Sequence, residues 1–419
     1  MVAWRVVLVV ATLMSSATCT LDSCFPDSGS SDTTSSNFNF SGVDIFGLGL
    51  FRELNSLMTS SQSAGDANLL VSPYSVWSAL SLALMGAEGR SRRQLEDALG
   101  LPTTRRGAYR TKYALDFVMR ALGSGTNGGP ELRRVDRAYF DPTVQLHPCV
   151  TNLLNDVQIL DMIFDSIGSA NKINNDVSMV TGGQIKDLLS SDALVNSLFV
   201  LLNAIYFKGS WQTKFDPKNT SKQKFNRQSG EMVAMADMMT VESTFNLAAS
   251  TSLGAAMLQL PYYNSNMSML VMLPDPSQST VDETLKQLSP TTLSQSLAAL
   301  KPTIVRVSLP KFDLAKKMED ELVQGLGRLG ITDIFNSSVA NFTSFTSDSS
   351  LYVDTAIHQA KVMVNEEGTV AAAATALTAT RSGSSNPVQF SANRPFLFLI
   401  YDSRVRVTLF AGIIRNPSK

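Results

Sequence analysis

Histidine is almost missing from this chain, whose 419 residues include only His147 and His358. A histidine-based metal site would need carboxylates or thiols around one of them, and no H-x-x-x-H or paired-cysteine spacing occurs. The sequence also lacks a G-x-S-x-G elbow, a Walker loop and a dinucleotide fingerprint. We therefore expect that the chain is not an enzyme and that it binds no metal ion and no cofactor. Both histidines are interpreted as structural or surface residues.

Charge is sparse as well, with 17% charged residues and a formal net charge of -1 at pH 7. A balance so close to zero gives no global argument for nucleic acid or for an acidic membrane surface as a partner. Apolar residues make up 44% of the chain, which is enough for a large core. No segment supplies the run of about 20 apolar residues that a membrane span needs. We expect a monomeric globular protein with no nucleic-acid or membrane partner.

Cysteine is rare, and the first of the three lies in a targeting pattern. Arg5 precedes an apolar run over 6–14 and small residues up to Cys19, which is typical of a secretory signal at residues 1–19. Cleavage near Cys19 leaves Cys24 and Cys149, which an oxidising compartment permits to be one disulfide or two separate thiols. Five N-x-S/T sequons fit export and are candidate glycosylation sites: Asn39, Asn219, Asn266, Asn336 and Asn341. We expect a secreted, extracellular glycoprotein.

The order of helical and strand patterns predicts the fold class. Residues 20–40 are rich in Ser, Asp, Thr and Asn, which predicts a flexible N-terminal segment. Apolar spacing then predicts helices over 43–58 and 75–85. Short apolar runs predict strands over 198–207, 256–260, 267–273, 303–309, 396–401 and 405–414. Helices first and strands later, without regular alternation, favour an α+β fold with antiparallel sheets in one domain at 41–419.

Residues 364–376 read VNEEGTVAAAATA, and this segment resembles the hinge and proximal reactive loop of an inhibitory serpin. Further segments resemble serpin sequences in the family's order: NLLVSPYS at 68–75, LNAIYFKGSW at 202–211, LPKF at 309–312, NRPFLFLIY at 393–401, and 410–417. The resemblance covers nearly all of the chain after residue 40. It implies a serpin-like single domain of about nine helices around three β-sheets, with an exposed reactive loop near the C-terminus.

Serpins act as bait: a protease attacks the loop, forms an acyl-enzyme and is trapped when the loop inserts into the largest sheet. The resemblance assigns the hinge to Glu366, Glu367, Gly368, Thr369, Val370, Ala371, Ala372, Ala373 and Ala374. From 368 to 380 there is no proline and no ionisable side chain, so the segment can enter a sheet without burying a charge. The favoured function is a suicide inhibitor of a serine protease. The alternative is a non-inhibitory serpin-fold carrier, chaperone or storage protein.

Arg381 followed by Ser382 is the candidate reactive bond. An arginine before the cleaved bond suits a trypsin-like protease, whose pocket carries a carboxylate. The commonest family loop length, counted from Gly368, instead places Ser382 before the cleaved bond, which would suit an elastase-like protease. We favour Arg381 because it is the sole basic residue from Gly368 to Asn393.

The resemblance also implies positions that support insertion. Ser72, Ser75, Asn203 and His358 lie where serpins build a polar cluster, the shutter, beneath the strands that part. Trp211 matches the residue at the top of that sheet, called the breach, where insertion begins; a buried core tryptophan is the equally valid alternative interpretation. Lys311 matches the usual partner of the hinge carboxylate Glu366.

Basic residues in the first third raise the possibility of glycosaminoglycan acceleration, which many serpins show. They are Arg105, Arg106, Arg110, Lys112 and Arg120, followed by Arg133, Arg134 and Arg137. Asp116 and Glu131 interrupt this set of positive charges. We therefore interpret the set as a solvated face.

Overall fold

The computed structural model describes residues 38–60, 66–122, 128–249, 251–367 and 386–419. The expected signal peptide, the hinge residues Gly368 to Ala374 and the candidate bond Arg381–Ser382 lie outside these ranges. Cys24, one half of the possible disulfide, lies outside them too. Glu366 and Glu367, which belong to the expected hinge, are the last described positions before the expected reactive loop.

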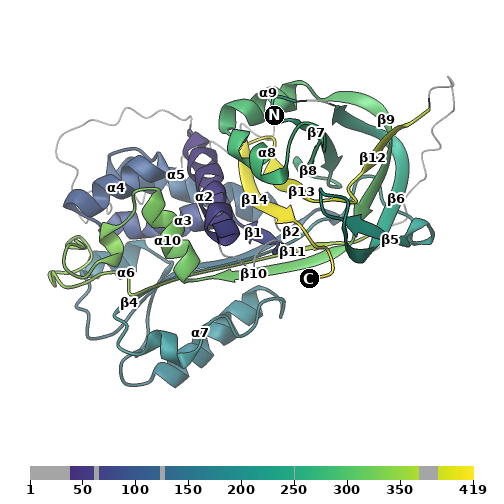
Figure 1. The fold of residues 1–419 in the computed structure, drawn as a ribbon. Coiled ribbons are helices and arrows are strands. Elements are labelled where there is room, and N and C mark those ends of the chain that lie inside the picture. Colours follow the sequence, from purple (N-terminus) through teal and green to yellow (C-terminus); the bar gives the residue numbers. More distant parts are fainter. Residues whose placement is uncertain (1–37, 61–65, 123–127, 250, 368–385) are drawn as a thin grey trace.

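Helices dominate the first part of the chain, as the apolar periodicity predicts (Figure 1). They are α2 (Ser41–Ser60), α3 (Pro73–Gly86), α4 (Gly89–Leu99), α5 (Arg105–Leu122), α6 (Pro148–Leu153), α7 (Ser166–Val180), α8 (Val281–Gln287), α9 (Pro290–Ala298) and α10 (Asp320–Arg328). The expected helices at 43–58 and 75–85 lie within α2 and α3.

Helix α3 begins where its sequence predicts. The Ser72 side chain caps it by accepting a hydrogen bond from the Ser75 amide, and Pro73 occupies the first turn, where a missing N–H costs nothing. Every residue of α3 is buried, as the apolar composition of this segment requires. Ser72 and Ser75 are thereby fixed inside the molecule at the start of a central helix.

The strands alternate with these helices at first and then follow one another. They are β1 (Leu69–Val71), β2 (Glu131–Phe140), β3 (Val157–Ile159), β4 (Phe199–Lys208), β5 (Ser221–Asn226), β6 (Met232–Ala248), β7 (Ala255–Pro261), β8 (Met267–Pro274), β9 (Lys301–Pro310), β10 (Phe312–Met318), β11 (Thr355–Val364), β12 (Val388–Ser391), β13 (Phe396–Asp402) and β14 (Val407–Ile414). Each strand expected from the apolar runs is present, which confirms the α+β class.

The larger sheet has the order β1-β14-β13-β8-β7-β6-β9-β12, with β5 paired to β6. Strand β6 is 17 residues long: it pairs with β5 and β9, and its last three residues pair with β7. A strand of this length runs through both parts of the sheet. Of the three sheets that the resemblance implies, two are therefore joined into one hydrogen-bonded network in the described part of the chain.

The smaller sheet has five strands in the order β10-β11-β4-β2-β3. Helix α7 lies on one side of it, and α2 and α3 lie on the other (Figure 1). Side chains from β2, β4 and α7 form a separate buried cluster under α7, including Tyr139, Ile173 and Leu202. The sheet is thus packed on both faces around β4, whose residues Phe199 to Phe207 are all buried.

Candidate functional site

The central pair of the smaller sheet, β11 and β4, is parallel. Its register runs from Thr355 opposite Val200 to Val362 opposite Phe207, with no strand between the two. Strand β11 ends two residues before Glu366. A segment that left β11, turned back and entered between these strands would run antiparallel to both. Since parallel pairing is slightly less stable per residue, such insertion would replace one weaker pair by two stronger ones.

The predicted shutter residues meet beneath this central pair. His358 of β11 lies directly opposite Asn203 of β4, with 2.5 Å between His358 Nδ1 and Asn203 Oδ1. The Ser72 amide donates to His358 Nε2 at 3.1 Å, so Nε2 carries no proton and Nδ1 donates to Asn203. Burial lowers the pKa of His358 to about 3. The imidazole is therefore a neutral bridge across the two strands.

The remaining shutter side chains complete the same network. Ser72 Oγ donates to the Leu409 carbonyl at 2.6 Å, and Asn203 Nδ2 donates to the Ser75 carbonyl at 2.9 Å. Ser75 Oγ donates to Asp136 Oδ1 at 3.2 Å, and Asn203 Nδ2 also contacts this carboxylate. The structure thus brings the four predicted residues together, and each finds a partner, as buried polar groups require.

Asp136 is a member of the shutter that sequence reasoning missed. It is buried on β2, where burial raises its pKa although the ion pair with Arg134 opposes this. Arg134 and Asp136 are two residues apart, so they project from the same face of the strand. That spacing is the signal in the sequence that could have identified them.

A chain of buried ion pairs continues from the shutter to α5. Arg134 binds Asp116 at 2.9 Å, and Lys112 binds both Asp116, at 2.8 Å, and Asp156, at 3.2 Å. Burial disfavours the charge on Asp116, but Lys112 and Arg134 outweigh it and hold the pKa of this carboxyl far below its usual range. These charges are stable inside the protein because each is paired.

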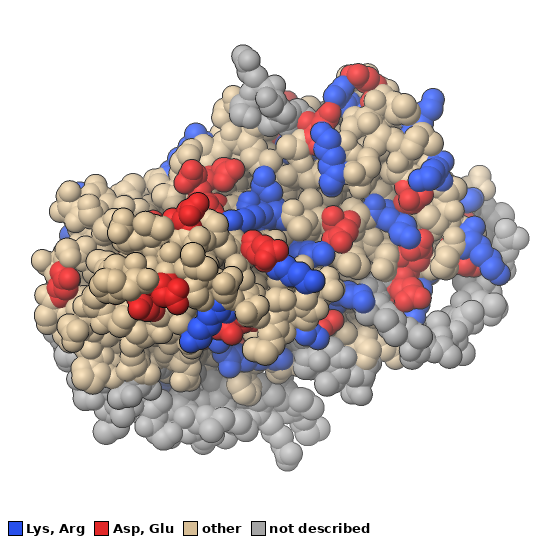
Figure 2. Space-filling model, turned by 90° about the horizontal axis from the view of Figure 1, so that it is seen from below, with Lys and Arg blue, Asp and Glu red and all other residues tan. Residues whose placement is uncertain are grey.

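The interpretation of the basic residues as a solvated face is wrong for three of them. Lys112 is 0% exposed, and the side chain of Arg134 is only 10% exposed and pairs with Asp116. Arg105 is 5% exposed and binds Glu88 at 2.8 Å. Arg106 and Arg110 are half-buried, whereas Arg120 is exposed. On the face shown in Figure 2, basic side chains are interspersed with acidic ones.

Trp211 binds the chain just before the expected reactive loop. Its indole Nε1 donates to the Asn365 carbonyl at 2.8 Å, and its ring stacks on Tyr262 with the centroids 4.7 Å apart. The Phe215 amide donates to the Glu366 carbonyl at 3.1 Å. The predicted breach residue therefore lies at the end of β11, where an inserting segment would begin to pair.

Glu366 and Lys311, the expected hinge pair, are 2.9 Å apart. Thr220, which sequence reasoning missed, donates its hydroxyl to the same carboxylate at 2.8 Å. Burial opposes ionisation of Glu366, but the hydrogen bonds from Lys311 and Thr220 outweigh it and lower its pKa. The Lys311 side chain is 39% exposed, so the pair contributes only about 0 to 1 kcal/mol to stability.

The sequons lie at the surface, with one partial exception. Asn39, Asn219, Asn266 and Asn336 are exposed. Asn341 is half-buried, and its Oδ1 accepts hydrogen bonds from the amide and hydroxyl of Thr343. Four of the five asparagines are thus accessible to modification.

The described ranges contain no candidate for two further classes of site. No group of three or more His, Cys, Asp or Glu side chains among these residues could hold a metal ion. None of the helices in these ranges has the length and apolar character to cross a membrane.

A central sheet covered on both faces, with a parallel middle pair and a buried polar bridge across that pair, fits a serpin-type fold. The chain belongs to the serpin family: the family model described as "Serpin (serine protease inhibitor)" matches residues 42–417. Serpins are protease inhibitors rather than enzymes, so the expectation that this chain is not an enzyme is confirmed.

Individual relatives agree with this assignment. The chain is 32% identical over 375 residues to serine protease inhibitor 88Ea of Drosophila melanogaster, covering 85% of this chain and 87% of the relative. It is similar to the crystal structure of Manduca sexta serpin-12, with a TM-score of 0.78, 25% identity and coverage of 91% and 99%. The crystal structure of native protease nexin-1 with heparin gives a TM-score of 0.76, 28% identity and coverage of 91% and 100%.

Proposed function

We propose that this protein is a secreted suicide inhibitor of a trypsin-like serine protease, with Arg381–Ser382 as the reactive bond. The observation that carries the proposal is the parallel β11–β4 pair, which lies directly upstream of the hinge. Once the loop is cut, residues after Glu367 can turn back and enter between these strands. The bound protease is then carried along the sheet before its acyl-enzyme is hydrolysed.

The energy available from insertion suits this mechanism. A new strand with about a dozen ladder hydrogen bonds, each worth about 1 kcal/mol net, would release on the order of 10 kcal/mol. Slowing deacylation about a millionfold requires about 8 kcal/mol on the barrier. The intact protein must then be held short of its most stable state by a kinetic barrier.

The shutter supplies a physical source for that barrier. The His358–Asn203 hydrogen bond joins the two strands that have to separate, and both residues are buried. Opening the sheet exposes or re-pairs every polar group of this cluster, which is costly inside a protein. We infer that the shutter keeps the sheet closed until the loop enters.

Secretion and glycosylation belong to the same proposal. They rest on the N-terminal targeting pattern and on four exposed sequon asparagines, Asn39, Asn219, Asn266 and Asn336. Expression in a secretory host tests them: glycosidase treatment of the exported protein should lower its mass, and Edman sequencing should find a new N-terminus near residue 20. An intracellular, unmodified protein would contradict this part.

The inhibitor proposal is tested by mixing the protein with trypsin and, separately, with an elastase. We expect a complex with trypsin that survives boiling in detergent and a released C-terminal fragment that begins at Ser382. A fragment that begins at Gly383, with a stable complex only to elastase, would move the reactive bond to Ser382. Cleavage by both enzymes without any stable complex would favour the carrier or storage alternative.

A further inference from the structure

The central pair β11 and β4 is also joined at the end farthest from the breach. Asp354 immediately precedes β11. Its Oδ2 accepts hydrogen bonds from two consecutive amides at the start of β4, those of Leu198 at 2.9 Å and Phe199 at 2.8 Å. The Asp354 amide in turn donates to the Phe199 carbonyl at 2.9 Å. Asp354 thus binds the beginning of one strand to the beginning of the other.

These contacts occupy backbone groups that a new strand would need. The amide and the carbonyl of Phe199 both face β11, because both bind Asp354. The β11–β4 ladder continues from this point, with Thr355 opposite Val200. A strand that enters along the whole of β4 has to pair with both groups of Phe199. The hydrogen bonds to the Asp354 carboxylate must break first.

The expected loop is long enough to reach this level. Its inserting part, from Thr369 to Arg381, has 13 residues. Residues of antiparallel strands face each other one to one, so an insertion that starts with Thr369 opposite Phe207 reaches Phe199 with Leu377. The shutter, at Asn203, is passed earlier. Asp354 therefore lies at the level that the inserting strand reaches last.

The Asp354 carboxylate can be released without leaving a polar group unpaired. It is half-buried, so water can reach it once it leaves β4. The Tyr352 hydroxyl, on its own side of the gap, also binds it, and this hydrogen bond raises the pKa of Tyr352. The two amides that it leaves are then paired by the inserted strand, as buried backbone donors require. The contact is consequently stable when closed and able to open.

We propose that Asp354 is a latch on the last stage of insertion: it keeps the far end of the β11–β4 pair closed in the intact protein and must release Leu198 and Phe199 before insertion is complete. This inference rests on the proposed inhibitory function, because it concerns the final stage of that mechanism. Hydrogen bonds to a carboxylate are about twice as strong as neutral ones, which suits a contact that has to hold a sheet closed.

Unfolding in guanidinium of the intact and the loop-nicked protein tests the latch. Asp354→Ala should lower the midpoint of the intact protein and leave that of the nicked protein unchanged, because the inserted strand replaces the carboxylate at Phe199. A residue with a merely structural role would lower both midpoints equally. Asp354→Asn keeps an oxygen that can accept the same hydrogen bonds, so its intact midpoint should lie between those of the unaltered chain and Asp354→Ala.

The rate of insertion is a second readout. A fluorescent synthetic peptide with the sequence of residues 369–380 should enter the sheet of the intact protein. Asp354→Ala should take up this peptide about tenfold faster than the unaltered chain, since two hydrogen bonds to a carboxylate no longer have to break. Uptake at the same rate in both proteins would contradict the latch.

Asp141→Ala is the matched control. Asp141 Oδ2 likewise accepts hydrogen bonds from two consecutive amides, those of Met162 at 2.9 Å and Ile163 at 3.0 Å. These bonds join the end of β2 to the segment before α7, so they do not span the strands that separate. Their loss should lower the midpoints of the intact and the nicked protein alike and leave the rate of peptide uptake unchanged.

The outcomes distinguish the latch from the function on which it rests. If the unaltered chain unfolds at the same midpoint before and after nicking and takes up no peptide, the loop does not insert, and the inhibitory function fails together with the latch. If nicking stabilises the unaltered chain, but Asp354→Ala behaves like Asp141→Ala in both measurements, insertion stands and the latch alone is wrong.

Discussion

At the scale of single residues, His358 makes stability depend on pH. Its pKa is about 3 in the folded protein against 6.5 for the free side chain, because burial disfavours the imidazolium. Between these values the unfolded chain binds more protons at this site than the native protein does. The contribution of His358 to the free energy of unfolding is therefore fully present above pH 6.5 and is lost as the pH falls toward 3.

The corresponding test compares the unaltered chain with His358→Gln. From pH 7 to pH 4 the free energy of unfolding measured in urea should fall more for the unaltered protein than for the variant, by up to a few kcal/mol, since one pKa unit corresponds to about 1.4 kcal/mol. Asp44, whose pKa burial raises to about 6, acts in the opposite direction but is common to both proteins. Identical pH dependence in the two proteins would contradict the assignment of a buried neutral imidazole.

Thr369 is the first residue expected to point into the sheet on insertion. Thr369→Arg should convert the protein from an inhibitor into a substrate, because a guanidinium would have to be buried at the point where insertion begins. Counting detergent-stable complexes per cleaved molecule measures this. Val370→Arg is the matched control: its side chain would face outward and should leave inhibition intact. Equal inhibition by both variants would argue against insertion.

At the scale of elements, α5 and β2 are joined by the buried pairs of Asp116. Asp116→Asn leaves Lys112 and Arg134 with one carboxylate fewer, and breaking a buried pair costs about 3–5 kcal/mol. Denaturant unfolding should show a loss of that order. Asp97→Asn, an exposed change on α4, should change stability by no more than about 0.5 kcal/mol. A similar small effect for Asp116→Asn would show that the pairs contribute little.

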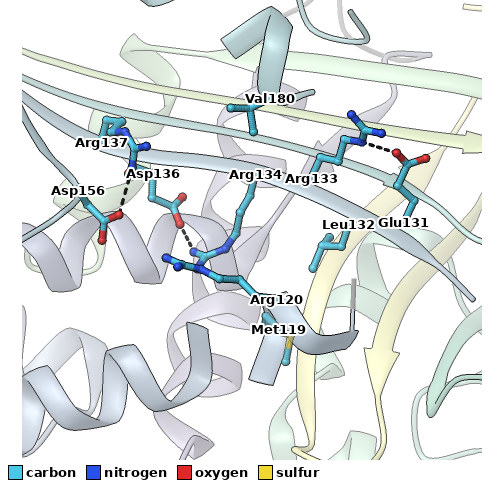
Figure 3. Close-up of a pocket in the computed structure, with 10 residues that line it drawn as sticks. All are labelled: Met119, Arg120, Glu131, Leu132, Arg133, Arg134, Asp136, Arg137, Asp156 and Val180. Carbon is cyan, nitrogen blue, oxygen red and sulfur yellow. Dashed lines mark hydrogen bonds and ion pairs between the residues drawn. The ribbon is translucent and has the colours of Figure 1, made fainter. Parts of the chain in front are cut away.

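The elements that could be predicted from the sequence are those whose apolar pattern matches their burial. Helix α3 and strands β4, β8 and β13 are almost wholly apolar and wholly or nearly wholly buried. Strand β2 was missed because it reads ELRRVDRAYF, which looks like a solvated segment. Two of its charges, Arg134 and Asp136, are nearly removed from water because Arg134 pairs with Asp136 (Figure 3) and with Asp116 of α5, and the contact with α5 is not visible in the sequence of the strand itself.

The same dependence on contacts distant in sequence separates the site residues that could be predicted from those that could not. Ser72, Ser75, Asn203 and His358 were identified through the resemblance, and the structure brings them together. Asp136 and Thr220 were not: the spacing of Arg134 and Asp136 indicates that the two side chains share one face of a strand, but a single sequence does not show that this face meets the shutter, and no comparable signal marks Thr220. The reactive loop itself stays a prediction.

At the scale of the whole molecule, the account requires that the intact protein is not in its most stable state. The parallel β11–β4 pair and the closed shutter hold the sheet at five strands in the described structure. On this account, a cut in the expected reactive loop allows the residues after Glu367 to enter the sheet. The cleaved chain should then gain a strand that is antiparallel to both neighbours. Its sheet should no longer need the shutter to hold β11 and β4 together.

Thermal unfolding of the intact and the loop-nicked protein, followed by circular dichroism, tests this most directly. We predict that protein nicked in the loop by a non-target protease melts well above the intact protein, while nicked Thr369→Arg melts close to its own intact form. If the nicked and intact proteins melt at the same temperature, the loop does not enter between β11 and β4, and the inhibitor mechanism is wrong.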